Sequence, residues 1–451
     1  MGLDGKKILT KMSTVRKLAL QNLEEPLKYS NFKTAIQTLN SADQALFHEL
    51  TQGTFREWKF LEWVLKKYIK KNPRKKLKTL LLMSSYQILF LDRIPAYAVF
   101  SEAKNISHSF CSVAEQKFLQ GVLKNIEREK IFFLDIREKS LKNIKQGVLP
   151  SSELDWAILN IEPDFLNAFL VEDRNRALAA LVQMKQKAKL IGYLLPGSMS
   201  KNTAQRHPST LTKRACVFAE KEFLTDPLAH VQGEASQWIC DQVANSLFNF
   251  KKENLKILEL SSGKGGKFLS TLAALNEINA VPSLEWTCAD NSHTQLQILQ
   301  KDILPVIKNL WPQTKIEIHQ TDWNHPILQN KKFDLVWCDA PCTGFGSCSK
   351  HPEILLTRGR EAVKAAQTLS LTQKKLCEAG LGLLNNGGIF VYSVCTITKA
   401  ETVDICEFIE QKFLVKPFFQ KYLWPGAAPA PEAEGFFACA FKNETVEKVR
   451  F

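Results

Sequence analysis

Apolar residues recur every three or four positions through the first third of the chain, which is the spacing of an amphipathic helix. One such run places Phe55, Trp58, Leu61 and Leu65 on a single helical face. The same period continues to about residue 138, with polar residues at the intervening positions. We therefore predict an all-α domain over residues 1–138.

The pattern becomes less regular in the next part of the chain. Residues 151–160 and 172–188 keep a helical period, whereas residues 195–210 are rich in polar and turn-forming residues. We interpret residues 139–210 as a helical linker between two folded domains.

Short apolar runs that alternate with helix-like segments follow residue 211. This alternation favours right-handed crossovers and a parallel sheet that is covered by helices on both faces. We predict a doubly wound, mostly parallel, Rossmann-like α/β domain over residues 211–451, whose ligands bind beyond the carboxyl ends of the strands. The predicted strands are residues 255–260, 284–290, 315–322, 333–341, 387–396 and 436–442.

Positive charge is concentrated in the helical first third. The chain carries a net charge of +14, and residues 1–150 hold 27 Lys and Arg against 14 Asp and Glu. Such asymmetry is typical of a polyanion-binding module joined to a nearly neutral one, although a solvated helix face is the plainer explanation of any single lysine run. We favour contacts between this domain, together with the linker, and the phosphates of a nucleic acid.

The remaining composition indicates a reduced, aqueous environment. The eleven cysteines are scattered, without the paired spacing of a zinc site or the framework of a disulfide-rich protein. The longest apolar run, residues 77–95, is interrupted by polar residues and is too short to cross a bilayer. We expect a cytoplasmic monomer without a metal site or a membrane segment.

A glycine-rich segment follows the first strand of the predicted α/β domain. Gly263, Gly265 and Gly266 permit a tight turn and leave helix N–H groups open to a ligand, but their spacing is not that of a dinucleotide or phosphate loop. Carboxylates end the next three predicted strands: Asp290, Asp322 and Asp339. A single one is explained by helix capping or by a turn. Three of them beside a glycine loop favour an adenosine-bearing, positively charged ligand over a pyrophosphate.

Two cysteines lie at the ends of predicted strands. Cys342 directly follows residues 333–341, and Cys395 is near the end of residues 387–396. If these strands are neighbours in the sheet, both thiols reach the same crevice. Chance is the alternative, because cysteine is common in protein cores.

The motifs around these cysteines resemble those of the RNA cytosine-C5 methyltransferases that use S-adenosylmethionine. The resemblance rests on DAPCTGFG followed by KHPE, on the cysteine of YSVCTI, on HVQGEASQ upstream, and on the closing segment LWPGAAPAPEAEGFFACAFK. In the first third, YQILFLDRIP and FLQGVLKNIERE are similar to a NusB-like RNA-binding domain. The resemblance therefore implies a NusB-like domain followed by a Rossmann-like methyltransferase domain.

The same resemblance implies a role for each site residue. Cys395 would be the nucleophile, Cys342 would assist release of the covalent adduct, and Asp339 would bind the cytosine edge and border the cofactor. Asp290 would bind the ribose of S-adenosylmethionine, and Asp322 its adenine. The methionine part would be lined by Ser261, Ser262, Gly263, Lys264, Gly265, Gly266 and Lys267.

The family chemistry explains the need for a thiolate. Cytosine C5 is a poor nucleophile, and addition of a thiolate to C6 makes it reactive, which is covalent catalysis. A carboxylate beside the thiol raises the pKa of a cysteine, so we expect Asp339 to oppose thiolate formation. A paired base is out of reach, so the target cytosine is single-stranded or flipped out.

The order of the two domains favours small-subunit (16S) ribosomal RNA as the substrate. Two alternatives remain open at this point. One is the same reaction on transfer RNA or on another ribosomal site. The other is a non-catalytic RNA-binding or ribosome assembly factor with a degenerate cofactor loop.

Overall fold

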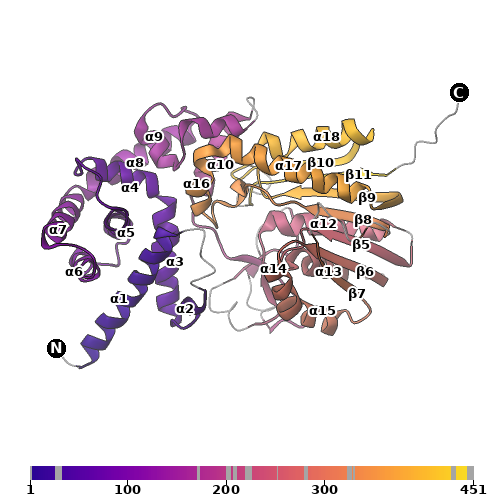
Figure 1. Cartoon of the computed structure of the whole chain (residues 1–451), viewed down its shortest axis with the longest axis horizontal. Helices are drawn as coiled ribbons and strands as arrows, with labels where there is room; N and C mark the ends of the chain where they lie inside the picture. Colours follow the sequence, from indigo (N-terminus) through magenta and orange to yellow (C-terminus); the bar gives the residue numbers. More distant parts are fainter. Residues whose placement is uncertain are drawn as a thin grey trace. The chain divides into compact units, whose positions relative to one another are not determined.

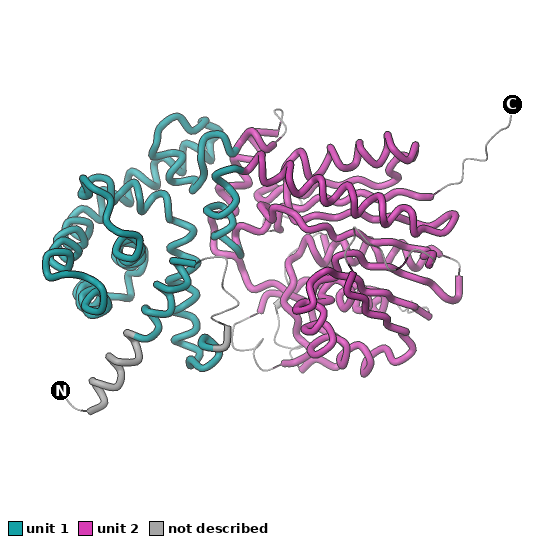
Figure 2. The backbone as a smooth tube through the Cα atoms, viewed as in Figure 1, with its two compact units in different colours: residues 1–165, 350–361 teal, residues 166–349, 362–451 magenta. Residues whose placement is uncertain are grey.

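Two compact units make up the chain in the computed structural model. One unit comprises residues 1–165 and 350–361, and the other comprises residues 166–349 and 362–451 (Figures 1 and 2). The structure describes residues 3–25, 33–169, 173–199, 205–206, 211–218, 226–250, 252–278, 283–321, 328, 331–427 and 433–443.

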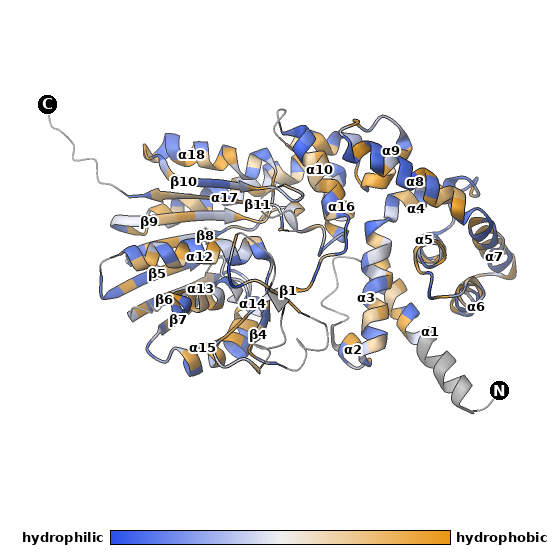
Figure 3. Ribbon diagram, turned by 180° about the vertical axis from the view of Figure 1, so that it is seen from behind, coloured by the Kyte–Doolittle hydropathy of each residue, from blue (hydrophilic) through white to orange (hydrophobic). Residues whose placement is uncertain are grey.

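The first unit is built from helices around α5. Almost every residue of α5 from Leu77 to Leu89 is buried, and α5 contacts α1, α3, α4, α6, α7 and α8. Helix α7 buries Leu119, Val122, Leu123 and Ile126 on one side and mixes polar with apolar residues along its length (Figure 3). The helices of this unit are α1 (Leu3–Glu24), α2 (Lys33–Gln37), α3 (Ser41–Arg56), α4 (Trp58–Lys66), α5 (Lys75–Phe90), α6 (Ala96–Ser107), α7 (Val113–Arg128), α8 (Lys130–Lys145), α9 (Glu153–Leu159) and α16 (Glu353–Thr357). The predicted all-α fold of the N-terminal part is confirmed.

A seven-stranded sheet forms the centre of the second unit. The strand order is β10-β11-β9-β8-β5-β6-β7, in which β9, β8, β5, β6 and β7 are parallel and β11 and β10 are antiparallel to their neighbours. The strands are β5 (Asn254–Leu260), β6 (Ser283–Asp290), β7 (Lys315–Gln320), β8 (Phe333–Asp339), β9 (Leu384–Val394), β10 (Pro417–Leu423) and β11 (Phe436–Lys442). The predicted doubly wound, mostly parallel sheet is confirmed.

Helices cover both faces of this sheet (Figure 1). One face packs its apolar residues, such as Trp286 and Trp337, against α12 and α13. The opposite face, with Val336 and Phe390, packs against α17 and α18. The helices of this unit are α10 (Arg174–Met184), α12 (Glu234–Asn249), α13 (Gly266–Glu277), α14 (His293–Ile298), α15 (Leu304–Leu310), α17 (Ala362–Leu381) and α18 (Val403–Phe413), with the short turns η4 (Leu299–Ile303), η5 (Phe345–Ser347) and η7 (Lys399–Glu401).

A small antiparallel sheet precedes the large one. Its order is β2-β3-β1-β4, and Tyr193 of β1 belongs to the same apolar core as α12 and α13. The strands are β1 (Ile191–Leu194), β2 (Gln205–Arg206), β3 (Cys216–Val217) and β4 (Ala229–Val231). Strands β1 and β2 lie in the segment for which the sequence indicated helices and a connector.

No helix in the described part of the chain combines the length and the apolarity that crossing a bilayer would require.

Candidate active site

The two cysteines singled out in the sequence lie side by side. Strands β8 and β9 are hydrogen-bonded neighbours, and their parallel register sets Asp339 opposite Ser393. Cys342 and Cys395 follow within three residues of that pair, each in a loop at the carboxyl end of its strand. Their Sγ atoms are 3.4 Å apart. The chain therefore brings two thiols together from positions 53 residues apart in the sequence.

The two thiols differ in proton affinity. The hydrogen bond from Cys342, helped by the positive charge of Lys267, lowers the pKa of Cys395 to about 7 in spite of burial and of the Asp339 charge. The same hydrogen bond, burial, and the negative charges of Glu401 and Asp339 raise the pKa of Cys342 well above its ordinary value. Cys395 is thus the thiolate near neutral pH, and Cys342 is the thiol that donates to it. Asp339 does oppose the thiolate, but the donor thiol and Lys267 outweigh it.

Asp339 is held from two sides. Its Oδ2 forms an ion pair with Nζ of Lys267, and its Oδ1 accepts a hydrogen bond of 2.9 Å from Ser393 Oγ. Trp337 Nε1 donates to the same hydroxyl at 3.0 Å. Although burial opposes its charge, Asp339 holds the pKa of Lys267 above its usual value. The carboxylate is therefore fixed in orientation.

A further carboxyl group lies close to this ion pair. Glu259 in β5 is buried and accepts a hydrogen bond of 3.2 Å from Trp286 Nε1. Burial, with a smaller effect of Asp339, raises the pKa of Glu259 to about 8. Near pH 7 this group is mostly protonated, so it adds little negative charge to the site.

The glycine loop connects β5 to α13 through left-handed backbone conformations. Gly263 and Gly265 have φ values of +56° and +79°, and Ser261 also has a positive φ of +59°. Asp290 fixes this loop, because its Oδ2 accepts the N–H of Gly263 at 2.9 Å. Its Oδ1 accepts the N–H of Ser292 at 2.8 Å. Asp290 thus joins the end of β6 to the loop after β5.

The residues of this loop fit an adenosine-bearing ligand. A Cβ built on Gly263 or Gly266 would meet no atom within 4 Å, so space is open beside the backbone. The buried Oγ of Ser262 has no hydrogen-bond partner among the described residues. The first turn of α13 carries N–H groups without intrahelical acceptors, and Asp290 keeps lone pairs for hydroxyl donors. Lys264 is exposed. Asp322, the predicted adenine contact, lies outside the described residues.

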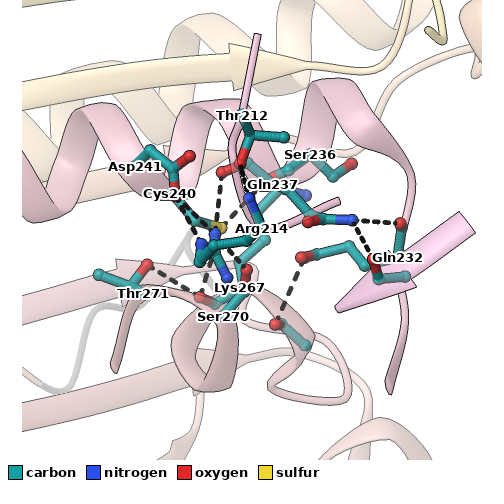
Figure 4. Close-up of polar contacts among 12 residues, drawn as sticks. Thr212, Arg214, Gln232, Ser236, Gln237, Cys240, Asp241, Lys267, Ser270 and Thr271 are labelled. Carbon is teal, nitrogen blue, oxygen red and sulfur yellow. Dashed lines mark hydrogen bonds and ion pairs between the residues drawn. The ribbon is translucent and has the colours of Figure 1, made fainter. Parts of the chain in front are cut away.

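Residues before and within α12 form hydrogen bonds with the glycine loop and with α13 (Figure 4). Gln232 donates to the carbonyl of Gly266 at 3.4 Å, and Gln237 donates to the carbonyl of Gln232 at 2.9 Å. Arg214 lies between α12 and α13, where its Nη2 donates to Asp241 at 2.6 Å and to Ser270 at 3.1 Å. These contacts hold the helix that carries Lys267.

Sequence reasoning missed several residues of the site. Ser393 and Trp337 lie on the two predicted strands that carry Asp339 and Cys395, and their period-two spacing puts them on one face. Glu259 is an acidic residue inside an apolar strand, which is itself a signal. Nδ1 of His351, in the KHPE segment, lies 3.3 Å from Oε1 of Glu353, and both residues belong to the first unit.

Comparisons with known proteins agree with this geometry. Residues 7–128 match the NusB family, and residues 246–417 match the family described as 16S rRNA methyltransferase RsmB/F. The chain is 24% identical over 404 residues to ribosomal RNA small subunit methyltransferase B of Proteus mirabilis (strain HI4320), covering 86% of this chain and 88% of that relative. It is 24% identical over 420 residues to the probable ribosomal RNA small subunit methyltransferase B of Bacillus subtilis (strain 168), covering 88% of each.

A solved structure shares the fold. The crystal structure of PH0851 superposes with a TM-score of 0.68 at 15% identity, covering 96% of this chain and 98% of that one. The family matches, the relatives and the strand order of the sheet lead to the same conclusion. Residues 246–417 thus form a domain that matches the RsmB/F family of 16S rRNA methyltransferases, and residues 7–128 form a NusB-family domain ahead of it.

Proposed function

We propose that this protein methylates C5 of a cytosine in 16S ribosomal RNA, with Cys395 as the nucleophile. The single observation that carries the proposal is the pair of thiols 3.4 Å apart, one of which has its pKa lowered to about 7. A lone thiolate would suffice for addition to a pyrimidine. A second thiol aimed at the first indicates that the adduct must also be released.

The cofactor that fits the glycine loop is S-adenosylmethionine, which when bound supplies an electrophilic methyl group. The residues proposed to hold it are Ser261 to Lys267 and Asp290, with Asp322 as an expected contact. Asp339 lies between this loop and the cysteines through its ion pair with Lys267.

The steps assigned to the chain's own residues follow from their protonation states. The Cys395 thiolate adds to C6 of the cytosine, which makes C5 nucleophilic. Asp339, fixed by Lys267 and Ser393, accepts hydrogen bonds from the protonated N3 and N4 edge of the base and so favours the addition. After methylation, water takes the C5 proton, the electron pair of that C–H bond forms the C5–C6 double bond, and the Cys395 sulfur leaves C6 with the electron pair of the C–S bond. The Cys342 thiol donates to the departing sulfur and stabilises it as a thiolate.

Two variants test this assignment. Cys395→Ala should show no transfer of a labelled methyl group to 16S rRNA. Cys342→Ala should accumulate a protein–RNA adduct that survives a denaturing gel, because the departing sulfur loses its donor. Full activity of Cys395→Ala would overturn the proposal.

The substrate is tested separately. Bisulfite sequencing of RNA from cells that lack the protein should show one 16S cytosine that has lost its methyl group. Loss of methylation in transfer RNA alone would keep the chemistry and overturn the proposed substrate.

A further inference from the structure

The residues that directly follow the two cysteines also contact each other through their side chains. Thr343 comes directly after Cys342, and Thr396 comes directly after Cys395. Their hydroxyl oxygens are 2.8 Å apart, and both threonines are buried. The two loops are therefore joined below the sulfur atoms by a hydrogen bond between equivalent positions.

A single buried carboxylate binds both loops at this point. Glu401, in η7, is fully buried, with 0% of its surface exposed. On the Cys342 side its Oε1 accepts the N–H of Thr343 at 2.8 Å and its Oε2 accepts the Thr343 hydroxyl at 2.6 Å. On the Cys395 side Oε2 accepts the hydroxyl of Thr398 at 2.6 Å and lies 3.5 Å from that of Thr396. Gln373 of α17 donates to Oε1 at 3.1 Å.

Removal of such a carboxylate from water is costly unless it is hydrogen-bonded. Burial raises the pKa of Glu401, and its hydrogen bonds to Thr343, Thr398 and Gln373 offset part of that effect. A carboxylate with only a structural role would need to bind no more than its own loop. Glu401 instead bridges the two loops that carry the reacting sulfur atoms. The negative charge of Glu401, together with that of Asp339, raises the pKa of Cys342, whereas the side-chain charges that act on Cys395 are those of Lys267 and Asp339.

We propose that Glu401 is a positioning residue for the cysteine pair: it fixes the distance between the two sulfur atoms and keeps Cys342 protonated, so that Cys342 donates to Cys395. The proposal rests on the proposed function, in which Cys395 is the nucleophile and Cys342 its donor. The charged and titratable groups that act on the two thiols are Glu401, Asp339, Lys267 and the thiols themselves.

The test is the pH dependence of alkylation of each thiol by iodoacetamide, with each modified cysteine located by peptide mass spectrometry. It uses the full-length protein without RNA or S-adenosylmethionine. At pH 7 the wild-type protein should alkylate Cys395 at least about tenfold faster than Cys342, because only the thiolate reacts. In Glu401→Gln, which keeps the shape but removes the charge, that ratio should fall below about threefold as the two titration midpoints converge.

The control is Asp404→Asn, which removes a half-buried carboxylate that pairs with Lys399 on the same segment. It should leave both midpoints and the ratio unchanged. If Asp404→Asn has the same effect as Glu401→Gln, the effect is not specific and the proposal is overturned. It is equally overturned if a folded Glu401→Gln protein alkylates like the wild type.

Thr343→Val covers the case in which Glu401→Gln does not fold. It keeps the carboxylate and the shape of the side chain but removes the hydroxyl that links Glu401 to Thr396. We expect a ratio between those of the wild type and Glu401→Gln, and an unchanged ratio overturns the proposal. Because alkylation needs no substrate, its failure is distinct from failure of the proposed function, which methyl transfer by Cys395→Ala reports.

Discussion

At the scale of single residues, two identical side chains acquire opposite protonation states from their neighbours. Cys395 has a donor thiol and the positive charge of Lys267 to offset the negative charge of Asp339, whereas Cys342 is exposed to the negative charges of both Glu401 and Asp339. One pKa unit corresponds to about 1.4 kcal/mol of preference between the two states. The division of labour between nucleophile and donor therefore does not require different residue types.

The pH dependence of adduct formation should follow Cys395. Its thiolate is the reactive form and its pKa is about 7, so the single-turnover rate should rise as the pH increases through 7 and then level off. In Cys342→Ala the donor is lost, and the midpoint should move upward towards about 8.5, the value of an unperturbed thiol. The single-turnover rate of methyl transfer from labelled S-adenosylmethionine to RNA, followed from pH 5.5 to 9.5, measures both midpoints. A midpoint that is the same in the two proteins would contradict the role of Cys342.

Lys267 should contribute to the same midpoint. Lys267→Met removes the positive charge beside Cys395 and the partner of Asp339. We expect a midpoint about one pH unit higher and, because one unit is tenfold in thiolate fraction, a rate at pH 6 about tenfold lower.

Lys264→Met is the comparison variant for Lys267→Met. Lys264 lies in the same loop but is exposed, so this change should alter the KM for S-adenosylmethionine without moving the midpoint. A shifted midpoint in Lys264→Met alone would contradict the assignment.

At the scale of elements, the sequence predicted the strands that are apolar and bounded by turns. Strands β5, β6, β8, β9 and β11 were found because both of their faces are buried. Strand β10 was missed because it is an edge strand that buries little, with exposed residues at alternate positions. Strands β1 to β4 were missed because each is only two to four residues long, which is too short for a period to be recognised.

The residues of the candidate site also differ in whether the sequence could predict them. Asp339, Cys342, Cys395 and the glycine loop were visible because chemically active residues follow apolar strands. Glu401 was not, because its role depends on a loop contact between residues that are 58 positions apart. The only signal in the sequence was that a Cys-Thr pair follows both strands, as Cys342-Thr343 and as Cys395-Thr396.

The turn between β5 and α13 should be sensitive at one glycine and tolerant at the next. Gly265 has a φ of +79°, and a Cβ there would come within 2.9 Å of Leu299. Gly265→Ala should therefore lower the free energy of unfolding by about 1–3 kcal/mol. Gly266→Ala, where a Cβ meets no atom within 4 Å, should change it by less than about 0.5 kcal/mol. Urea unfolding of the two variants measures the difference, and equal losses would show that the backbone conformation of Gly265 is not the cause.

At the scale of the whole molecule, charge and chemistry belong to different units. The helical unit, which contains the NusB-family match, holds most of the excess positive charge. The sheet unit holds both thiols and the glycine loop. Affinity for RNA should therefore be altered mainly by changes in the first unit, and the rate of adduct formation by changes in the second.

Exposed lysines of the first unit should set the salt dependence of RNA binding. Lys70 and Lys71, between α4 and α5, are exposed and form no ion pair with another described residue. If both contact phosphates, the double variant Lys70→Ala, Lys71→Ala should reduce the slope of log K against log salt by about 1.4–1.8. Lys66→Ala is the matched control, because Glu153 already pairs with Lys66, and its slope should be close to that of the wild type. Filter binding from 50 to 300 mM salt would detect the difference, and equal slopes in all three proteins would place the RNA contact elsewhere.

The hydrogen-bonded register of β8 and β9 has a consequence for recognising such sites in other chains. The positions of the two sulfur atoms are determined by the hydrogen-bonded pairing of β8 with β9. The connection between these strands, which carries α16 and α17, does not determine them. Insertions or deletions in that connection would change the count of residues between the thiols and leave the catalytic geometry intact. A search pattern with a fixed gap would overlook genuine homologues, whereas one anchored on the two strand ends would retrieve them.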